Sequence, residues 1–110
     1  MPVMAIYEFD NVTADEYAEF RRKLPLTAAP RGALVHAFGG DDDGFVTIEL
    51  WENRRALESF VDDILEPLVT RMGLPLTRPR IIDVEDFVMT DDLPRQARKI
   101  PIGDMLADAL

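Results

Sequence analysis

Apolar and polar residues alternate along residues 45–51, and apolar residues then recur in adjacent pairs at every fourth position until Gly73. Alternation with a period of two is typical of a strand with two different faces, whereas pairs at a spacing of four indicate a wide apolar stripe on a helix. The pattern therefore predicts a strand that leads directly into a long amphipathic helix. Asn53 is suited to cap this helix and Gly73 to end it. Pro67 predicts a kink in the preceding turn, because it removes one backbone donor.

The N-terminal part of the sequence predicts a strand followed by a shorter helix. Residues 3–9 again alternate between two faces. Thr13 and Glu16 have the spacing of a capping box, in which each side chain bonds the backbone of the other residue. We therefore expect a helix from about Ala14, and Pro25 ends it because proline cannot continue the helical hydrogen bonding.

Two further strands complete the predicted fold. Residues 33–38 form the second strand, and a turn at residues 43–44 joins it to residues 45–51 as a hairpin. Residues 81–89 are expected to form the fourth strand. The resulting order of strand, helix, strand, strand, helix, strand predicts an α+β fold of the ferredoxin-like βαββαβ type, with two helices on one face of an antiparallel sheet.

The two faces of the hairpin differ in chemistry. Pairing Phe38 with Phe45 places His36 opposite Thr47, and a slip of two residues would change these partners but not the face. One face is mixed, and carries Leu34, His36, Phe38, Phe45, Thr47, Glu49 and Trp51. The other face is wholly apolar, and carries Ala33, Val35, Ala37, Val46, Ile48 and Leu50. Two short helices can cover only one face, so we expect a sheet-to-sheet homodimer that buries about 800 Å² per subunit.

The junction between the central strand and the long helix resembles a known family. Residues 49–60, ELWENRRALESF, are similar to this junction in the antibiotic biosynthesis monooxygenase-like group of the dimeric α+β barrel superfamily. The resemblance covers roughly residues 3–89. It implies a ferredoxin-like dimeric barrel, and the superfamily includes cofactor-independent oxygenases that convert polyketide phenols to quinones, haem-degrading enzymes and small cyclases. Members of the family often carry histidine or tyrosine where this chain has Phe60, and this departure argues against carrying over a helical acid or base.

Composition narrows the possible functions and locations. The 110 residues suit one domain, predicted at residues 1–89, followed by a tail at residues 90–110 that is either mobile or wraps a partner subunit. Twelve basic against 21 acidic residues give a net charge of −9, which argues against nucleic acid as a partner. The sequence has no cysteine, no signal-type start and no apolar run of about 20 residues, so we expect a cytoplasmic protein that does not enter a membrane.

The mixed hairpin face holds the candidate chemistry. His36, the single histidine, lies near Glu49, and this pair could act as a proton shuttle in which the carboxylate holds the imidazole. The competing interpretation is a structural polar cluster, since buried ion pairs also gather titratable groups. Candidate residues for binding a substrate are aromatic or polar positions on the same side, namely Tyr7, Phe20, Thr47, Trp51 and Phe60.

Three functional hypotheses remain open at this point. The first is a cofactor-independent oxygenase that deprotonates an aromatic or polyketide-like small molecule in a cavity between the helices and the sheet. The second is a cofactor-free cyclase or proton-transfer enzyme that uses the same residues, and the third is a non-catalytic dimer that binds a small ligand. We expect no cofactor and no metal ion, because the sequence has no glycine-rich nucleotide loop and no paired-histidine spacing, and the acidic run at residues 41–43 does not match a calcium loop.

Overall fold

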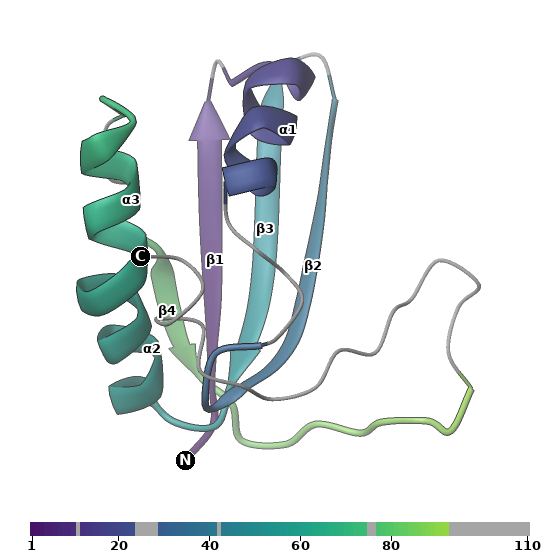
Figure 1. Cartoon of the computed structure of the whole chain (residues 1–110). Coiled ribbons are helices and arrows are strands. Elements are labelled where there is room, and N and C mark those ends of the chain that lie inside the picture. The colour runs from purple at the N-terminus through teal and green to yellow at the C-terminus, as the bar shows by residue number, and fades with distance from the viewer. Residues whose placement is uncertain (11, 24–28, 42, 75–76, 93–110) are drawn as a thin grey trace.

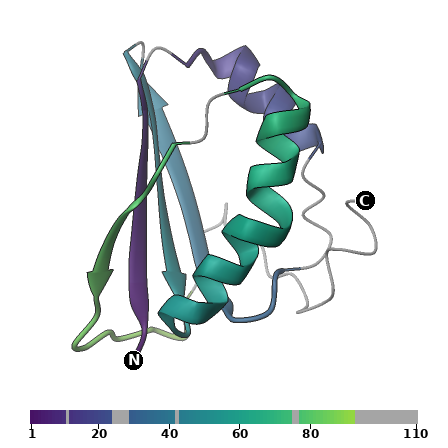
Figure 2. The same cartoon turned by 90° about the vertical axis from the view of Figure 1, so that its left-hand side faces the viewer.

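The computed structural model describes residues 1–10, 12–23, 29–41, 43–74 and 77–92. In chain order its elements are β1 (Val3–Asp10), α1 (Ala14–Lys23), β2 (Ala33–Asp41), β3 (Gly44–Trp51), α2 (Arg54–Phe60), η1 (Val61–Leu65), α3 (Glu66–Arg71) and β4 (Arg80–Asp83). The strands form one antiparallel sheet in the order β2-β3-β1-β4, and all helices lie on one face of it (Figures 1 and 2). This arrangement confirms the predicted ferredoxin-like α+β fold.

Both predicted helix starts are capped by the residues that the sequence indicates. The backbone N–H of Thr13 donates to Glu16 Oε1 at 3.3 Å, and the backbone N–H of Glu16 donates to Thr13 Oγ1 at 3.1 Å. The backbone N–H of Ala56 donates to Asn53 Oδ1 at 2.8 Å. These bonds satisfy backbone donors that a helix leaves free in its first turn, and so they fix where each helix begins.

The long helix is continuous in space but changes its hydrogen-bonding pattern near Pro67. Elements α2, η1 and α3 follow one another without a break, and η1 is a π-helical turn in which the backbone N–H of Glu66 donates to the carbonyl of Val61. Pro67 stands in the first turn of α3, where its missing N–H costs least. The predicted kink thus takes the form of a widened turn before the proline. Gly73 ends the helix at φ 72°, as predicted.

The fourth strand is shorter than the predicted 81–89. Its pairing with β1 runs from Ile6 with Arg80 to Val3 with Asp83, and one further backbone bond joins Val84 to Pro2. The pairing ends at Val3, which is the first residue of β1. Residues 84–92 extend away from the domain (Figure 1), and Phe87, Val88 and Met89 are exposed. Most of the predicted tail, residues 93–110, lies outside the described residues.

The hairpin pairs with the two-residue slip that the sequence left open. Phe38 lies opposite Thr47, and His36 lies opposite Glu49. An irregularity between Ala33 and Val35 shifts the register at the start of β2, so that Ala33 pairs with Trp51 and packs against the core. The predicted faces of Ala33 and Leu34 are therefore wrong, because the extra residue moves Ala33 to the helix side and leaves Leu34 exposed.

The core lies between the sheet and the long helix. Its buried members come from β1, β3 and the helical segment from α2 to α3, and they are Val3, Ala5, Tyr7, Trp51, Leu57, Phe60, Ile64 and Leu68. None of the described helices is long and apolar enough to cross a membrane.

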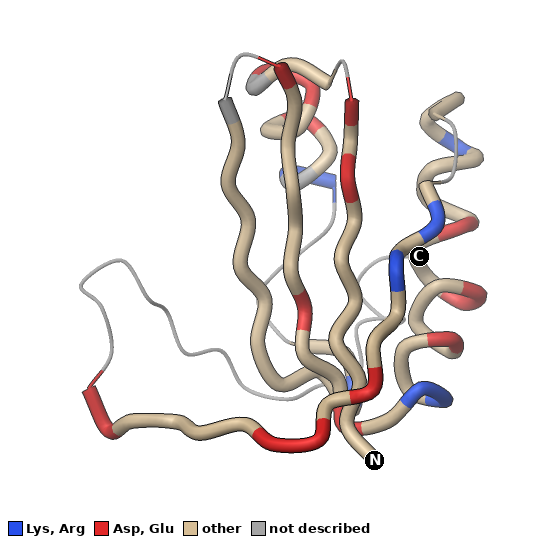
Figure 3. The backbone as a smooth tube through the Cα atoms, turned by 180° about the vertical axis from the view of Figure 1, so that it is seen from behind, with Lys and Arg blue, Asp and Glu red and all other residues tan. Residues whose placement is uncertain are grey.

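The opposite face of the sheet carries none of the described helices (Figure 2). Three apolar side chains are well exposed on it, namely Val35 at 43%, Val46 at 39% and Ile48 at 45%. Met4, Ile6, Leu50 and Ile82 share this face by strand register and are partly buried. Seen from that side, the strands carry few charged positions (Figure 3). We call this surface the open face.

Candidate functional site

A buried carboxylate stands at the centre of the helix-facing side of the sheet. Glu49 lies on β3, the strand between β2 and β1, and is only 8% exposed. Its Oε2 lies 3.0 Å from Nδ1 of His36 on the neighbouring strand β2. The strand register explains this contact, because directly opposite residues of an antiparallel pair have side chains on the same face. The structure thus brings together the two residues that the sequence proposes for proton transfer.

The second oxygen of this carboxylate is also occupied. Trp51 Nε1 donates to Glu49 Oε1 at 3.0 Å, and the two residues share a face because they are two positions apart on one strand. Trp51 is 2% exposed, and its ring lies 5.3 Å from that of Phe60 on α2. The ring of Phe60 therefore positions the indole of Trp51, and the hydrogen bond from the indole positions the carboxylate of Glu49.

His36 connects this buried network to the surface. Its side chain is 40% exposed, whereas that of Glu49 is 10% exposed. An ionised carboxylate can only accept hydrogen bonds, so Nδ1 of His36 carries the proton toward Glu49 and the lone pair of Nε2 remains available. An imidazole held in this tautomer is suited to act as a general base toward a molecule that reaches Nε2.

Tyr7 lies on the same face, on the other side of β3. Its Cα is paired with that of Thr47, and the side chain is 3% exposed. Among the described residues its hydroxyl has no hydrogen-bond partner. Burial raises the pKa of Tyr7 well above its ordinary value, and the negative charge of Glu49 raises it further. Tyr7 is therefore a neutral hydroxyl that can donate a hydrogen bond.

The remaining predicted binding residues are spread around this network. Thr47 is buried on β3 between Tyr7 and Phe38 in the strand register, and Phe60 is part of the core. Phe20 is partly buried on α1, with its ring 6.4 Å from that of Tyr17. These residues line the helix-facing side, but Phe60 contributes to packing and carries no polar group toward the network.

Two hollows formed by described residues lie elsewhere than the predicted cavity. One of about 340 Å³ is on the open face, lined by Ala37, Phe38, Gly39, Gly40, Val46 and Ile48. Another of about 300 Å³ is at the hairpin end and is lined by Glu8, Asp10, Gly40, Asp43, Gly44, Phe45 and Val46. Neither is the cavity expected between the helices and the sheet, because core side chains fill much of that space.

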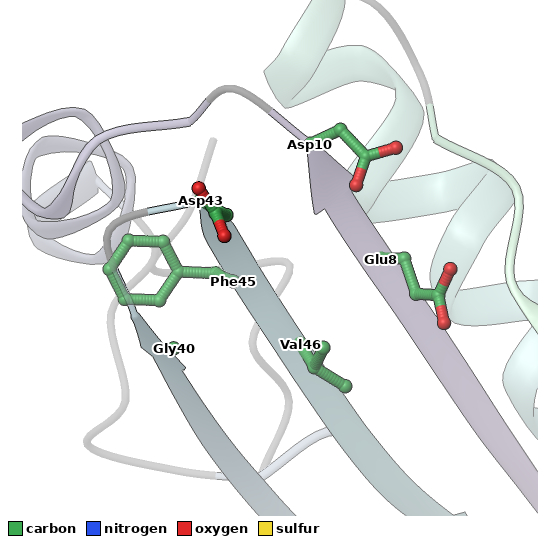
Figure 4. Close-up of a pocket in the computed structure, with 7 residues that line it drawn as sticks. Glu8, Asp10, Gly40, Asp43, Phe45 and Val46 are labelled. Atoms are coloured by element: carbon green, nitrogen blue, oxygen red, sulfur yellow. The ribbon is translucent and has the colours of Figure 1, made fainter.

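The hollow at the hairpin end was missed by sequence reasoning. Figure 4 shows Glu8 and Asp10 on β1, with Asp43 in the turn just before the neighbouring strand β3. The available signal was the pair of carboxylates two positions apart on the open face of β1, followed by an acidic turn in the hairpin. Within the part of the chain that the structure describes, no group of three or more metal-binding side chains is placed to hold an ion.

Comparison with known proteins shows the fold and not the reaction. No sequence family and no curated protein matches the chain. Among solved structures, a variant of SnoaB, a cofactor-independent oxygenase from Streptomyces nogalater, superposes with a TM-score of 0.58 at 14% identity over 79% of this chain and 95% of its own. Rv0793 from Mycobacterium tuberculosis superposes with a TM-score of 0.64 at 15% identity, over 81% of this chain and 100% of its own.

A third structure is that of a proposed antibiotic biosynthesis monooxygenase from Deinococcus radiodurans. It gives a TM-score of 0.53 at 14% identity over 84% of this chain and 100% of its own. Identities this low leave the activity open, since one fold serves many reactions. The chain therefore has the fold of the antibiotic biosynthesis monooxygenase-like group, as the resemblance of residues 49–60 predicts.

Proposed function

We propose that the chain is a cofactor-independent oxygenase-like enzyme that acts on an aromatic or polyketide-like small molecule. The observation that carries this proposal is the contact of 3.0 Å between His36 Nδ1 and Glu49 Oε2, with Glu49 held in turn by Trp51. A general base needs an orienting partner and access to the substrate; Glu49 orients His36, and the His36 side chain is 40% exposed. The fold shared with a cofactor-independent oxygenase supports the same choice.

The proposed reaction needs only a base and molecular oxygen. His36 Nε2 removes a proton from the acidic CH₂ of an anthrone-type substrate. The resulting anion transfers one electron to O₂, and the substrate radical and superoxide combine to a peroxide anion. The proton returns from His36 to give a hydroperoxide, which loses water to leave a carbonyl group. One O₂ is consumed per substrate, with one oxygen atom in the product and the other in water.

A second candidate is a dimer that binds a small ligand without converting it. It is favoured by the two hollows described above, neither of which is lined by His36, and by Phe60, which packs on Trp51. In this case the network of His36, Glu49 and Trp51 would be structural.

Oxygen uptake with 1,8-dihydroxy-9-anthrone tests the proposal. The wild type should consume O₂ faster than the uncatalysed solution, and His36→Gln should lower kcat by about 10²–10⁴. Glu58→Gln is a matched control, because Glu58 is exposed on α2 and should leave the rate unchanged. Equal rates in wild type and His36→Gln would refute the role of His36. Conversion at the same rate without oxygen would favour a cyclase or proton-transfer enzyme, and binding without conversion would favour the second candidate.

The open face supports a homodimer as the functional unit. Val35, Val46 and Ile48 are exposed together on one face of the sheet, and Gly39 leaves space beside them, since a Cβ there would meet no atom within 4 Å. A second copy of the chain, packed sheet to sheet, would cover these side chains and fill the hollow of about 340 Å³.

Light scattering at micromolar concentration tests this assembly. The wild type should have the mass of a dimer, and Ile48→Glu should give a monomer, because it would bury a carboxylate in the centre of the interface. Glu58→Gln on the helical side should remain a dimer. A monomeric wild type would contradict the assembly.

A further inference from the structure

The open face carries a cation and a carboxylate that lie diagonally from each other on neighbouring strands. Arg80 on β4 is paired with Ile6, and Glu8 follows two positions after Ile6 on β1, so all three side chains share this face. Arg80 and Glu8 are both exposed. Within the described part of the chain, neither of them forms an ion pair. Two opposite charges therefore lie on the surface that the proposed dimer covers.

These charges restrict how a second copy can lie on the open face. Among the described side chains, Arg80 is the one basic group that strand register places there, whereas Glu8 and Asp10 are acidic. Acidic positions gather toward the hairpin end of the strands, as Figure 3 shows from that side. Like charges that meet in an interface are strongly unfavourable, and a buried cation needs a close carboxylate. The arrangement must therefore keep the acidic ends apart and bring Arg80 to a carboxylate.

One two-fold axis meets this requirement. The two subunits of a sheet-to-sheet homodimer present the same surface to each other, so positions at equal distances on either side of the axis come into contact. An axis midway between Glu8 and Arg80 places each of them against the other residue of the partner subunit. With a strand spacing of about 4.8 Å and a rise of about 3.3 Å per residue, this axis crosses β3 close to Ile48, among the exposed apolar side chains.

The same axis accounts for the hollow on the open face. This hollow of about 340 Å³ lies at Gly39 and Val46, and a Cβ at Gly39 would meet no atom within 4 Å. Met4 and Ile82 are paired on β1 and β4, and the axis brings them over the hollow of the partner subunit. The arrangement that pairs the charges thus also places apolar side chains in the hollow, so two separate features favour one orientation.

We infer that two copies of the chain pack open face to open face about this axis, and that Arg80 of each copy forms an ion pair with Glu8 of the partner subunit. The inference rests on the homodimer proposed above, and it adds the orientation of the subunits and the residues that determine it. Arginine suits this role, because its guanidinium stays charged and can bond both oxygens of one carboxylate. The symmetry repeats the ion pair, so each substitution acts at two places in the dimer.

Charge reversal, followed by native mass spectrometry over a dilution series, tests this pairing. Arg80→Glu would bring like charges together and should raise the Kd of the dimer by about 100-fold or more, and Glu8→Arg should do the same. Mixed in equal amounts, the two variants should form a heterodimer with a Kd within about tenfold of the wild type, because each copy supplies the charge that the other lacks. Arg55→Glu is the matched control, since Arg55 is exposed on α2 and its reversal should leave the Kd unchanged.

The mixture distinguishes a pair between subunits from a pair within one chain, because each variant chain still carries like charges at residues 8 and 80. No heterodimer in the mixture, or an Arg80→Glu dimer as tight as the wild type, overturns the inference. In either case a dimeric wild type and a monomeric Ile48→Glu leave the proposed homodimer standing. A monomeric wild type overturns both.

Discussion

Replacing Glu49 by glutamine keeps the shape of the side chain but changes which of its atoms can accept a hydrogen bond. The carboxylate accepts from both His36 and Trp51 at 3.0 Å. Glutamine has one acceptor oxygen and one donor NH₂ group. Trp51 can only donate, so the oxygen must face the indole and the NH₂ must face His36. Nδ1 of His36 then has to accept, which moves the ring proton to Nε2 and removes the free acceptor that a base needs.

The magnitude follows from the two contacts. A hydrogen bond to a charged group contributes about 1.5–3 kcal/mol and a neutral one about 0.5–1.5 kcal/mol. The loss of two hydrogen bonds to a charged acceptor is offset in part, because Glu49 is only 8% exposed and burying its negative charge is unfavourable. We expect the free energy of unfolding to fall by about 1–2 kcal/mol. The preference for the Nδ1–H tautomer, about tenfold or more in the wild type, should reverse.

Long-range ¹H–¹⁵N correlation spectra measure this tautomer directly. The chain has one histidine, so the spectrum contains one imidazole and needs no assignment. At mildly alkaline pH the wild type should show a protonated Nδ1 and a bare Nε2, and Glu49→Gln should show the opposite. Urea unfolding supplies the stability change. The same tautomer in both proteins would mean that Glu49 does not orient His36, and the base would lose its physical support.

Two further predictions concern the backbone and the buried tyrosine. Gly32 has φ 88°, and a Cβ there would lie 2.5 Å from Ala56 Cβ, so Gly32→Ala should lower the free energy of unfolding in urea by about 2–4 kcal/mol. Gly73 has φ 72° with no atom within 4 Å of a Cβ, so Gly73→Ala should lower it by only about 1 kcal/mol. Equal losses in the two variants would contradict the clash at Gly32. The pKa of Tyr7 is raised in the folded protein, because burial disfavours the charged form. Its contribution to the free energy of unfolding is therefore constant below about pH 10. Above this pH the contribution is lost, because the unfolded chain releases the tyrosine proton first. Between pH 10 and 11 the wild type should lose up to about 1.4 kcal/mol more than Tyr7→Phe, and parallel profiles would contradict burial of the hydroxyl.

The sequence predicts the fold because each local signal agrees with the others. The capping box at Thr13, the cap at Asn53 and the stop at Gly73 all occur where the pattern places them. The length of β4 was not predictable from its own residues, since it is limited by where β1 begins. The irregularity after Ala33 was equally hidden, because it depends on pairing across the sheet.

The candidate site was predictable in part. The alternation of residues along each strand predicts that His36 and Glu49 share one face of the sheet. The strand register then places them directly opposite each other. No spacing rule predicts the bond from Trp51 to Glu49, because it depends on side-chain directions. The same holds for the Tyr7 hydroxyl, which has no hydrogen-bond partner among the described residues. The hollow on the open face was missed because it lies where small residues of β2, such as Gly39, stand beside β3.

The proposed function requires that a ligand binds against the helix-facing side of the sheet, at His36. Titrating the wild type with 1,8-dihydroxyanthraquinone, while recording the imidazole nitrogens and the methyl groups of Val46 and Ile48, locates the ligand. We expect a large shift of His36 Nε2 and small shifts of both methyl-bearing residues, which lie on the open face. Large shifts of Val46 and Ile48 with an unchanged imidazole would place the ligand on the open face and contradict the proposed role of His36.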